Sequence, residues 1–319
     1  MLRAFMIVAC LLAGVIPAAA QDWPQRPVRF IVPFAAGGGT DIVARVLAQK
    51  LSAMLGKPFI VENKPGASGM IGAHAVAKGE TDGYLFLIGS PAEIALNQHL
   101  FPKMTYAPET DLVPITLLAW TPLVLVAHPS FQATTPAELI TLAHAQEVDF
   151  SSPGIGSAHH LTGEYMKTLQ SMRLVHVPYR GASAAVTDAV AGQVKLTISG
   201  MPPVVPFVQS GQLKAIAVTS KKRAPMFPEI PALAETPGFE DFDFTNWFGL
   251  MARSGTPQGI LDKLSQSVVI ALQDPNVRDV LAQQAAEPVG NTPAEFRDFL
   301  RAESAKYARI VKLTGVQVK

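Results

Sequence analysis

Four short segments of this chain share one pattern of glycine and hydroxyl-bearing residues. They are 34–41, 65–69, 152–160 and 179–183, and each follows an apolar run that predicts a strand and precedes a pattern that predicts a helix. The first turn of a helix has backbone N–H groups without intrahelical partners and carries a partial positive charge. Such a helix start can bind an anion without any cationic side chain. The chemistry that these segments support is therefore the binding of a small anion, most simply a carboxylate.

The first of these segments contains three consecutive glycines. Residues 37–39 follow the apolar run 28–32 and open a helical pattern. We expect Thr40 or Asp41 to cap that helix through a side-chain oxygen. An ordinary strand–helix connection would explain one such loop, but the recurrence of the pattern favours a shared anion site.

If the two halves of the chain face each other, the hydroxyl groups of these segments converge on one cleft. The residues concerned are Thr40, Ser68, Ser152, Ser157 and Ser183. Arg180 is the cationic side chain best placed to join them, although a solvated loop position explains it equally well. Four aromatic residues beside the segments either wall the cleft or pack in the core: Phe34, Tyr179, Trp247 and Phe248.

Patterns that would indicate an enzyme are incomplete. Residues 154–156 give two glycines of a dinucleotide-binding fingerprint, but His159 stands where the third is required. Residues 66–69 are one residue short of a nucleophile elbow. His160 and Glu164 lie one helical turn apart, and no third metal ligand is evident. We therefore expect no cofactor, no metal and a protein that binds its ligand without converting it.

The first twenty of the 319 residues look like a secretory signal peptide. Arg3 precedes an apolar stretch, and residues 18–20 are alanines that offer a cleavage site. Cys10 is the only cysteine, so the chain after residue 20 has none, and removal of Arg3 leaves 25 basic residues against 25 acidic ones. This balance does not favour nucleic acid or an anionic membrane as a partner. We expect a protein of the bacterial periplasm or the exterior.

Predicted strands and helices alternate along most of the chain. This alternation predicts mostly parallel sheets covered by helices, with ligand sites beyond the carboxyl ends of the strands. The apolar segment 112–127 is too long for one ordinary strand and contains two prolines, so we predict two strands there, one of them crossing between the halves. A strand over 244–251 leads out of the second half. The tail is predicted to be helical at 257–273, at roughly 275–286 and at 293–314.

Several motifs occur in an order that is typical of one known family. The first runs from Trp23-Pro24 through residues 33–38 to Thr40-Asp41. The later ones are Asn63-Lys64-Pro65-Gly66, Asp82-Gly83-Tyr84, Ser152-Pro153-Gly154, Pro178-Tyr179-Arg180-Gly181, Pro228-Glu229-Ile230-Pro231 and Trp247-Phe248-Gly249-Leu250. Together they resemble the substrate-binding proteins of tripartite tricarboxylate transporters, the Bug receptors, over essentially the whole chain after residue 20.

This resemblance implies an α/β protein with the two-domain periplasmic-binding-protein fold of the Venus-flytrap type II class. Each domain is then a mostly parallel sheet flanked by helices. We place the signal peptide at 1–20, domain 1 at 22–124 plus 244–319, and domain 2 at 125–243. Closure is expected as a hinge motion about the crossing segments near 121–127 and 243–250.

The implied function is that of a periplasmic solute-binding receptor that captures a small carboxylate and delivers it to the permease subunits of a tripartite tricarboxylate transporter. In the family, the loops that match 34–41 and 152–157 bind a ligand carboxylate, and the ligands include dicarboxylates, tricarboxylates and aromatic acids. The segment 89–94 departs from the family's Thr/Asn/Ser-rich loop, which contacts the distal end of the ligand, so the particular carboxylate is left open. We expect the ligand to be bound by Phe34, Ala36, Gly37, Gly38, Thr40, Asp41, Ser68, Ser90, Ser152, Gly154, Gly156, Ser157, His160, Tyr179, Arg180 and Gly181.

Two other functions use the same features. A receptor whose closed form signals to a membrane sensor kinase would present the same site. A secreted hydrolase of small esters would use Ser68 or Ser157 as its nucleophile. No set of nucleophile, base and orienting group can be assembled from the sequence, which favours a receptor over the hydrolase. The two receptor functions use the same closed state and are not separated by the sequence. We favour the transport receptor, acting as a monomer.

Overall fold

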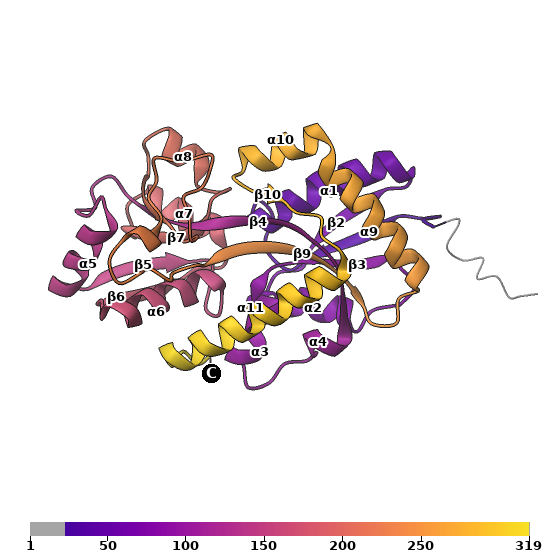
Figure 1. The fold of residues 1–319 in the computed structure, drawn as a ribbon, viewed down its shortest axis with the longest axis horizontal. Coiled ribbons are helices and arrows are strands. Elements are labelled where there is room, and N and C mark those ends of the chain that lie inside the picture. Colours follow the sequence, from indigo (N-terminus) through magenta and orange to yellow (C-terminus); the bar gives the residue numbers. More distant parts are fainter. Residues whose placement is uncertain (1–22, 319) are drawn as a thin grey trace, which may run out of the picture.

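The computed structural model of the protein describes residues 23–318. The predicted signal peptide at 1–20 lies outside the described residues. The described part of the chain forms two lobes that lie side by side and are joined by two long strands (Figure 1). The ligand cavity described below lies where these lobes meet.

The first lobe is built on three parallel strands. β1 (Val28–Val32) lies between β2 (Phe59–Asn63) and β3 (Leu85–Gly89). Helix α1 (Gly39–Leu55) connects β1 to β2, and α2 (Met70–Ala77) connects β2 to β3. Four of the five residues of β1 are buried, as expected for a parallel strand that is covered on both faces.

The second lobe repeats this arrangement. β5 (Val148–Ser152) lies between β6 (Leu174–Pro178) and β7 (Leu196–Gly200), again with parallel pairing. Helix α6 (Ala158–Gln170) connects β5 to β6, and α7 (Ala182–Val190) connects β6 to β7. In each lobe the loops that precede the helices therefore gather at the carboxyl ends of the strands.

Two long antiparallel strands join the lobes. β4 (Leu112–Ala127) pairs first with β9 (Thr245–Arg253) and then with β7 and with β8 (Lys214–Val218). The prediction of two strands over 112–127 is wrong, because β4 is one strand of 16 residues. Its prolines are tolerated because the pairing with β9 shifts register just after Pro114 and ends at Pro122, where β7 takes over.

The whole sheet is mixed and is flanked by helices. Its strand order is β2-β1-β3-β9-β4-β7-β5-β6, and β8 and the short β10 (Glu287–Pro288) also pair with β4. The other helices are η2 (Ala67–Gly69), η3 (Ala92–Leu96), α3 (Asn97–Leu100), α4 (Pro108–Asp111), α5 (Pro136–Ala145), α8 (Val205–Gln209), η4 (Leu233–Glu235), α9 (Gln258–Gln273), α10 (Pro275–Gln283) and α11 (Pro293–Thr314). The predicted tail helices are confirmed, although α10 ends at Gln283 and not near 286.

The C-terminal helix α11 lies across both lobes (Figure 1). It packs against β4, against α6 of the second lobe and against η3 of the first. On its buried face, the Glu303 carboxylate accepts hydrogen bonds from the Trp247 indole of β9 (2.9 Å) and from the Tyr307 hydroxyl (2.8 Å). Lys306 pairs with the other carboxylate oxygen. This cluster fixes α11 to one of the strands that join the lobes.

Glu303→Ala is expected to lower the free energy of unfolding by about 2–4 kcal/mol, because it leaves a buried indole N–H and a buried hydroxyl without acceptors. Urea unfolding followed by tryptophan fluorescence measures this loss. Arg301→Ala, on the exposed side of the same helix, is the control and should change the free energy by less than about 0.5 kcal/mol. Equal losses in the two variants would contradict the role of the cluster.

Candidate functional site

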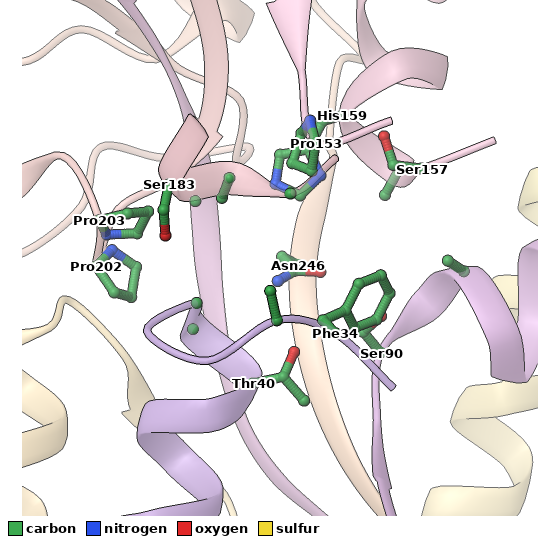
Figure 2. A pocket seen from close by; sticks show the side chains of 18 of the residues that line it. Phe34, Thr40, Ser90, Pro153, Ser157, His159, Ser183, Pro202, Pro203 and Asn246 are labelled. Atoms are coloured by element: carbon green, nitrogen blue, oxygen red, sulfur yellow. The ribbon is translucent and has the colours of Figure 1, made fainter. Parts of the chain in front are cut away.

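A cavity of about 250 Å³ lies between the two lobes. Loops that follow β1 and β3 line it from the first lobe, and loops that follow β5, β6 and β7 line it from the second. Figure 2 shows Phe34, Thr40 and Ser90 on one side and Ser157 and Ser183 on the other. The volume lies below the roughly 300–1,000 Å³ of pockets for drug-sized ligands, so the cavity suits a smaller molecule.

The first turns of three helices line this cavity. They are the starts of α1, α6 and α7, and their lining residues are Gly39, Thr40, Ala158, His159, Ala182, Ser183 and Ala184. The N–H groups of a first turn have no intrahelical acceptor and carry partial positive charge. Over residues 23–318, Arg180 is the one lining side chain that carries a full charge at neutral pH, and no carboxylate joins it. The cavity therefore offers several donors to an anion.

At the start of α1, the side chain of Asp41 holds the glycine loop by hydrogen bonds. The N-cap is Gly38, with no side-chain cap, so the prediction that Thr40 or Asp41 caps the helix is wrong. The Asp41 carboxylate instead accepts hydrogen bonds from the Gly37 N–H (2.9 Å), from Arg45 and from Asn63. Burial raises the pKa of Asp41, but these hydrogen bonds outweigh it and leave the pKa below its usual range. Asp41 thus secures the glycine loop and leaves the lining N–H groups free.

The start of α6 rests on a chain of buried polar contacts. Ser157 is the N-cap, and its hydroxyl accepts from the His160 N–H (3.1 Å) and donates to the Gly154 carbonyl (2.7 Å). The His160 ring stacks on the His176 ring with centroids 3.9 Å apart, and His176 Nε2 lies 2.7 Å from Ser152 Oγ. Burial lowers the pKa of His160 to about 4 and that of His176 to about 3, so both rings are neutral at pH 7.

His159 lines the cavity directly (Figure 2). Burial lowers its pKa to about 4, so its imidazole is neutral and presents one donor and one acceptor. Its Nδ1 atom is buried and has no hydrogen-bond partner among residues 23–318. A bound molecule is the natural partner for such an atom, because a buried polar group without a partner is costly.

The cationic side chain of Arg180 lies directly before the start of α7. Gly181 is the N-cap, with φ of +119°, and its N–H donates to the Pro153 carbonyl (2.9 Å). A residue with a side chain would be strained in this conformation, which explains the glycine. Arg180 directly precedes Gly181 and Ser183 follows it two residues later, and both line the cavity.

The strands that join the lobes form one wall of the cavity. Thr121 of β4 and Asn246 and Phe248 of β9 line it, and all three are buried. Side chains alternate between the faces of a strand, so Trp247, between Asn246 and Phe248, points to the opposite face. There it bonds to Glu303 and does not line the cavity.

The two lobes touch each other beside the cavity. The Ser68 hydroxyl of the first lobe donates to the Ile155 carbonyl of the second (2.5 Å). Phe101 of the first lobe lies so close to Gly156 that a Cβ there would come within 3.1 Å of its ring. The arrangement is therefore one in which the lobes are closed over the cavity.

The structure brings half of the expected ligand-binding residues to the cavity wall. These are Phe34, Ala36, Gly38, Thr40, Ser90, Ser157, Arg180 and Gly181. The others stand behind or beside the wall: Gly37, Asp41, Ser68, Ser152, Gly154, Gly156, His160 and Tyr179. Several of these hold lining loops in place, and the Tyr179 hydroxyl donates to Asp188 of α7 (2.8 Å).

Four further residues line the cavity and were not expected from the sequence: Asn246, Thr121, Pro202 and Pro203. His159 also lines it, whereas the sequence led us to expect its neighbour His160. Asn246 had a usable signal in the sequence, since it is an amide directly before the apolar run 247–252. The sequence has no signal that tells His159 from His160, because both lie in the first turn of α6 and only the orientation of this helix decides which one faces the cavity.

The described residues contain no group of three or more histidine, cysteine, aspartate or glutamate side chains that could hold a metal ion. Among residues 23–318, no helix is long and apolar enough to cross a membrane.

Two α/β lobes that close over a cavity and are joined by crossing strands define a periplasmic binding protein. The sequence matches the family described as "Tripartite tricarboxylate transporter family receptor" over residues 43–316. It is 38% identical to the protein BugT of Bordetella pertussis over 306 residues, which are 95% of this chain and 94% of that protein. The chain therefore belongs to the tripartite tricarboxylate transporter receptor family.

Solved structures of similar proteins agree with this assignment. "R. palustris Rpa4515 with adipate" has 34% sequence identity and a TM-score of 0.89, with 92% of this chain and 99% of that one covered. MatC (Rpa3494) from Rhodopseudomonas palustris with bound malate has 30% identity and a TM-score of 0.85, with 91% and 100% covered. A third similar structure, of the periplasmic binding protein BugD, has 34% identity and a TM-score of 0.88, with 93% and 100% covered. Members of the family are periplasmic solute receptors.

The neutral histidines predict how stability responds to acid. Their pKa values lie below the usual 6.5 only in the folded state, so between about pH 6.5 and pH 4 the unfolded chain binds more protons and stability falls as the pH is lowered. His176→Gln keeps a polar group near Ser152, but the glutamine cannot ionise. The urea midpoint of this variant should therefore fall less between pH 7.0 and pH 4.5 than that of the natural protein. Equal losses in the variant and the natural protein would contradict this explanation.

Proposed function

We propose that the protein captures a small dicarboxylate between its lobes and delivers it to the membrane subunits of a tripartite tricarboxylate-type transporter. The observation that carries this proposal is the meeting of three helix starts, from two lobes, at one cavity without a lining carboxylate. Each charge-assisted hydrogen bond to a carboxylate contributes about 1.5–3 kcal/mol. Several such contacts give useful affinity without a second cationic side chain.

The apolar part of the cavity lining supports a ligand with an apolar middle. Phe34, Phe248, Pro202 and Pro203 line the cavity together with the polar groups. A short aliphatic chain between two carboxylates would pack on these side chains while its ends meet the N–H and hydroxyl donors. The adipate and malate of the similar proteins are molecules of this kind.

We further propose that the lobes move as two bodies with the boundaries expected from the sequence, 22–124 plus 244–319 and 125–243. Motion about β4 and β9 would open the cavity to let the ligand enter. A ligand that contacts donors from both lobes favours the closed form, since it interacts more strongly with that state. The hydrogen bond from Ser68 to Ile155 would form on closure. A membrane partner that contacts both lobes could then recognise the loaded receptor.

The ester hydrolase alternative is disfavoured by the partners of its candidate nucleophiles. The Ser68 hydroxyl donates to the Ile155 carbonyl and the Ser157 hydroxyl to the Gly154 carbonyl. A carbonyl cannot take the proton of a nucleophile as a histidine does. Ser152 does pair with His176, but it is fully buried and does not line the cavity.

Calorimetric titration of the purified chain without residues 1–20 tests the function. We expect malate, succinate or adipate to bind with one site per chain and to raise the melting temperature, and we expect 1,4-butanediol, which has no charge, to do neither. If no dicarboxylate binds, the proposed function is contradicted.

Arg180→Gln is expected to weaken dicarboxylate binding about 10- to 100-fold, because it removes a charged donor worth about 1.5–3 kcal/mol. The dissociation constant from the same titration measures this change. Arg301→Gln, on the exposed side of α11, removes an equal charge away from the cavity and should leave the constant unchanged. An Arg180→Gln constant within twofold of the natural one would place the ligand elsewhere.

A further inference from the structure

A buried glutamate lies directly behind the cavity wall. Glu93 belongs to the π-helical turn η3, which begins at the lining residue Ala92, directly after the lining residues Ser90 and Pro91. Its side chain is completely buried. It also falls in the segment 89–94, where the sequence departs from the pattern of the family it resembles. Its role is not explained by the anion site described above.

Two glycines make room for this carboxyl group. A Cβ at Gly89 would lie 2.5 Å from Glu93 Oε1, and a Cβ at Gly69 would lie 2.8 Å from Oε2. Atoms do not approach so closely, so both positions require glycine as long as the carboxyl group is there. The group therefore has a fixed place between the end of β3 and the loop that carries Ser68.

The backbone N–H and the hydroxyl of Ser90 are both hydrogen-bonded to the Glu93 carboxyl group. The Ser90 N–H donates to Oε1, and the Ser90 hydroxyl lies 3.0 Å from Oε2. No cationic group within residues 23–318 pairs with this carboxyl. The nearby Tyr106 hydroxyl donates to the backbone carbonyl of Glu93 (2.6 Å) and not to its carboxyl group. Ser90 is thus the link between a buried acid and the cavity.

The elements packed against η3 also carry titratable groups, among them His74 of α2, His99 of α3, Glu109 and Asp111 of α4, and Glu303 of α11. His99 bonds to Ser304, Asp111 to Lys78, and Glu303 to Trp247 and Tyr307. None of the five is hydrogen-bonded to the Glu93 carboxyl, which leaves burial as the main influence on it.

Burial raises the pKa of Glu93 to about 8 and outweighs the hydrogen bonds from Ser90. At neutral pH the group is therefore mostly an uncharged acid. Its O–H can donate to Ser90 Oγ, and the serine hydroxyl is then free to donate into the cavity. When the acid ionises, it can only accept, so the serine hydroxyl must turn toward it and a negative charge lies behind the anion site.

We propose that Glu93 is a positioning residue that, in its uncharged form, directs the Ser90 hydroxyl into the cavity as a donor to an oxygen of the ligand. The inference rests on the proposed function, since it assigns the partner of one lining group. It gives the site a preference for a ligand with a carboxylate, carbonyl or hydroxyl oxygen near Ser90 and against an ammonium group there. It also couples binding to the uptake of one proton as the pH rises toward 9.

Titration of malate and adipate between pH 7.0 and pH 9.5 tests this proposal, because both ligands stay fully ionised in that range. We expect the association constant to be about tenfold lower at pH 9 than at pH 7, following the uncharged fraction of Glu93. Glu93→Gln imitates the uncharged acid, since its amide can donate to Ser90 Oγ and its carbonyl can accept from the Ser90 N–H. Its profile should be flat. Glu287→Gln, which removes an acid of raised pKa away from the cavity, should keep the natural profile.

The natural protein alone provides a second readout if Glu93→Gln does not fold. Calorimetry at pH 8.0 in buffers of different ionisation enthalpy should show net proton uptake when the ligand binds. A pH-independent constant without proton uptake overturns the role of Glu93 and leaves the receptor function intact, as does a Glu93→Gln profile that still falls with pH. Absence of binding at every pH overturns the proposed function and this inference with it.

Discussion

The structure depends on backbone N–H groups that no atom of their own helix can satisfy. The first turns of α1, α6 and α7 all open onto one cavity, and among the described residues no carboxylate lines it. Buried donors without partners are costly, and helix starts add partial positive charge. A bound anion would remove this cost. In the proposed function, the unfilled hydrogen-bonding capacity of these helix starts is the source of the affinity for a carboxylate.

The sheet topology makes this meeting possible. In each lobe a central strand has a parallel neighbour on both sides, so the loops that precede the helices lie at one edge. β4 and β9 then run from lobe to lobe and turn the two edges toward each other. Because side chains alternate between the two faces of these strands, neighbouring residues line different surfaces. Thr121 and Asn246 face the cavity, while Trp120 and Thr245 face a groove on the opposite side.

Much of this arrangement could be predicted from the sequence, because its signals are local. The β–loop–α units and the four glycine- and hydroxyl-rich segments each depend on a few adjacent residues, and the helices of both lobes begin within or directly after those segments. The errors concern contacts between distant residues. β4 is one strand because its pairing partner changes at Pro122, and Asp41 does not cap α1 because Asn63 and Arg45 take its oxygens. The choice between His159 and His160 likewise depends on the orientation of α6 in space.

The proposed function requires that donors from both lobes bind one anion, and amide NMR spectra can follow these donors individually. Isotope-labelled protein would be titrated with adipate while the ¹H–¹⁵N resonances of Thr40, His159 and Ser183 are followed. All three amide resonances should shift together with one dissociation constant. Shifts confined to a single lobe, or confined to the groove beside Trp120, would contradict it.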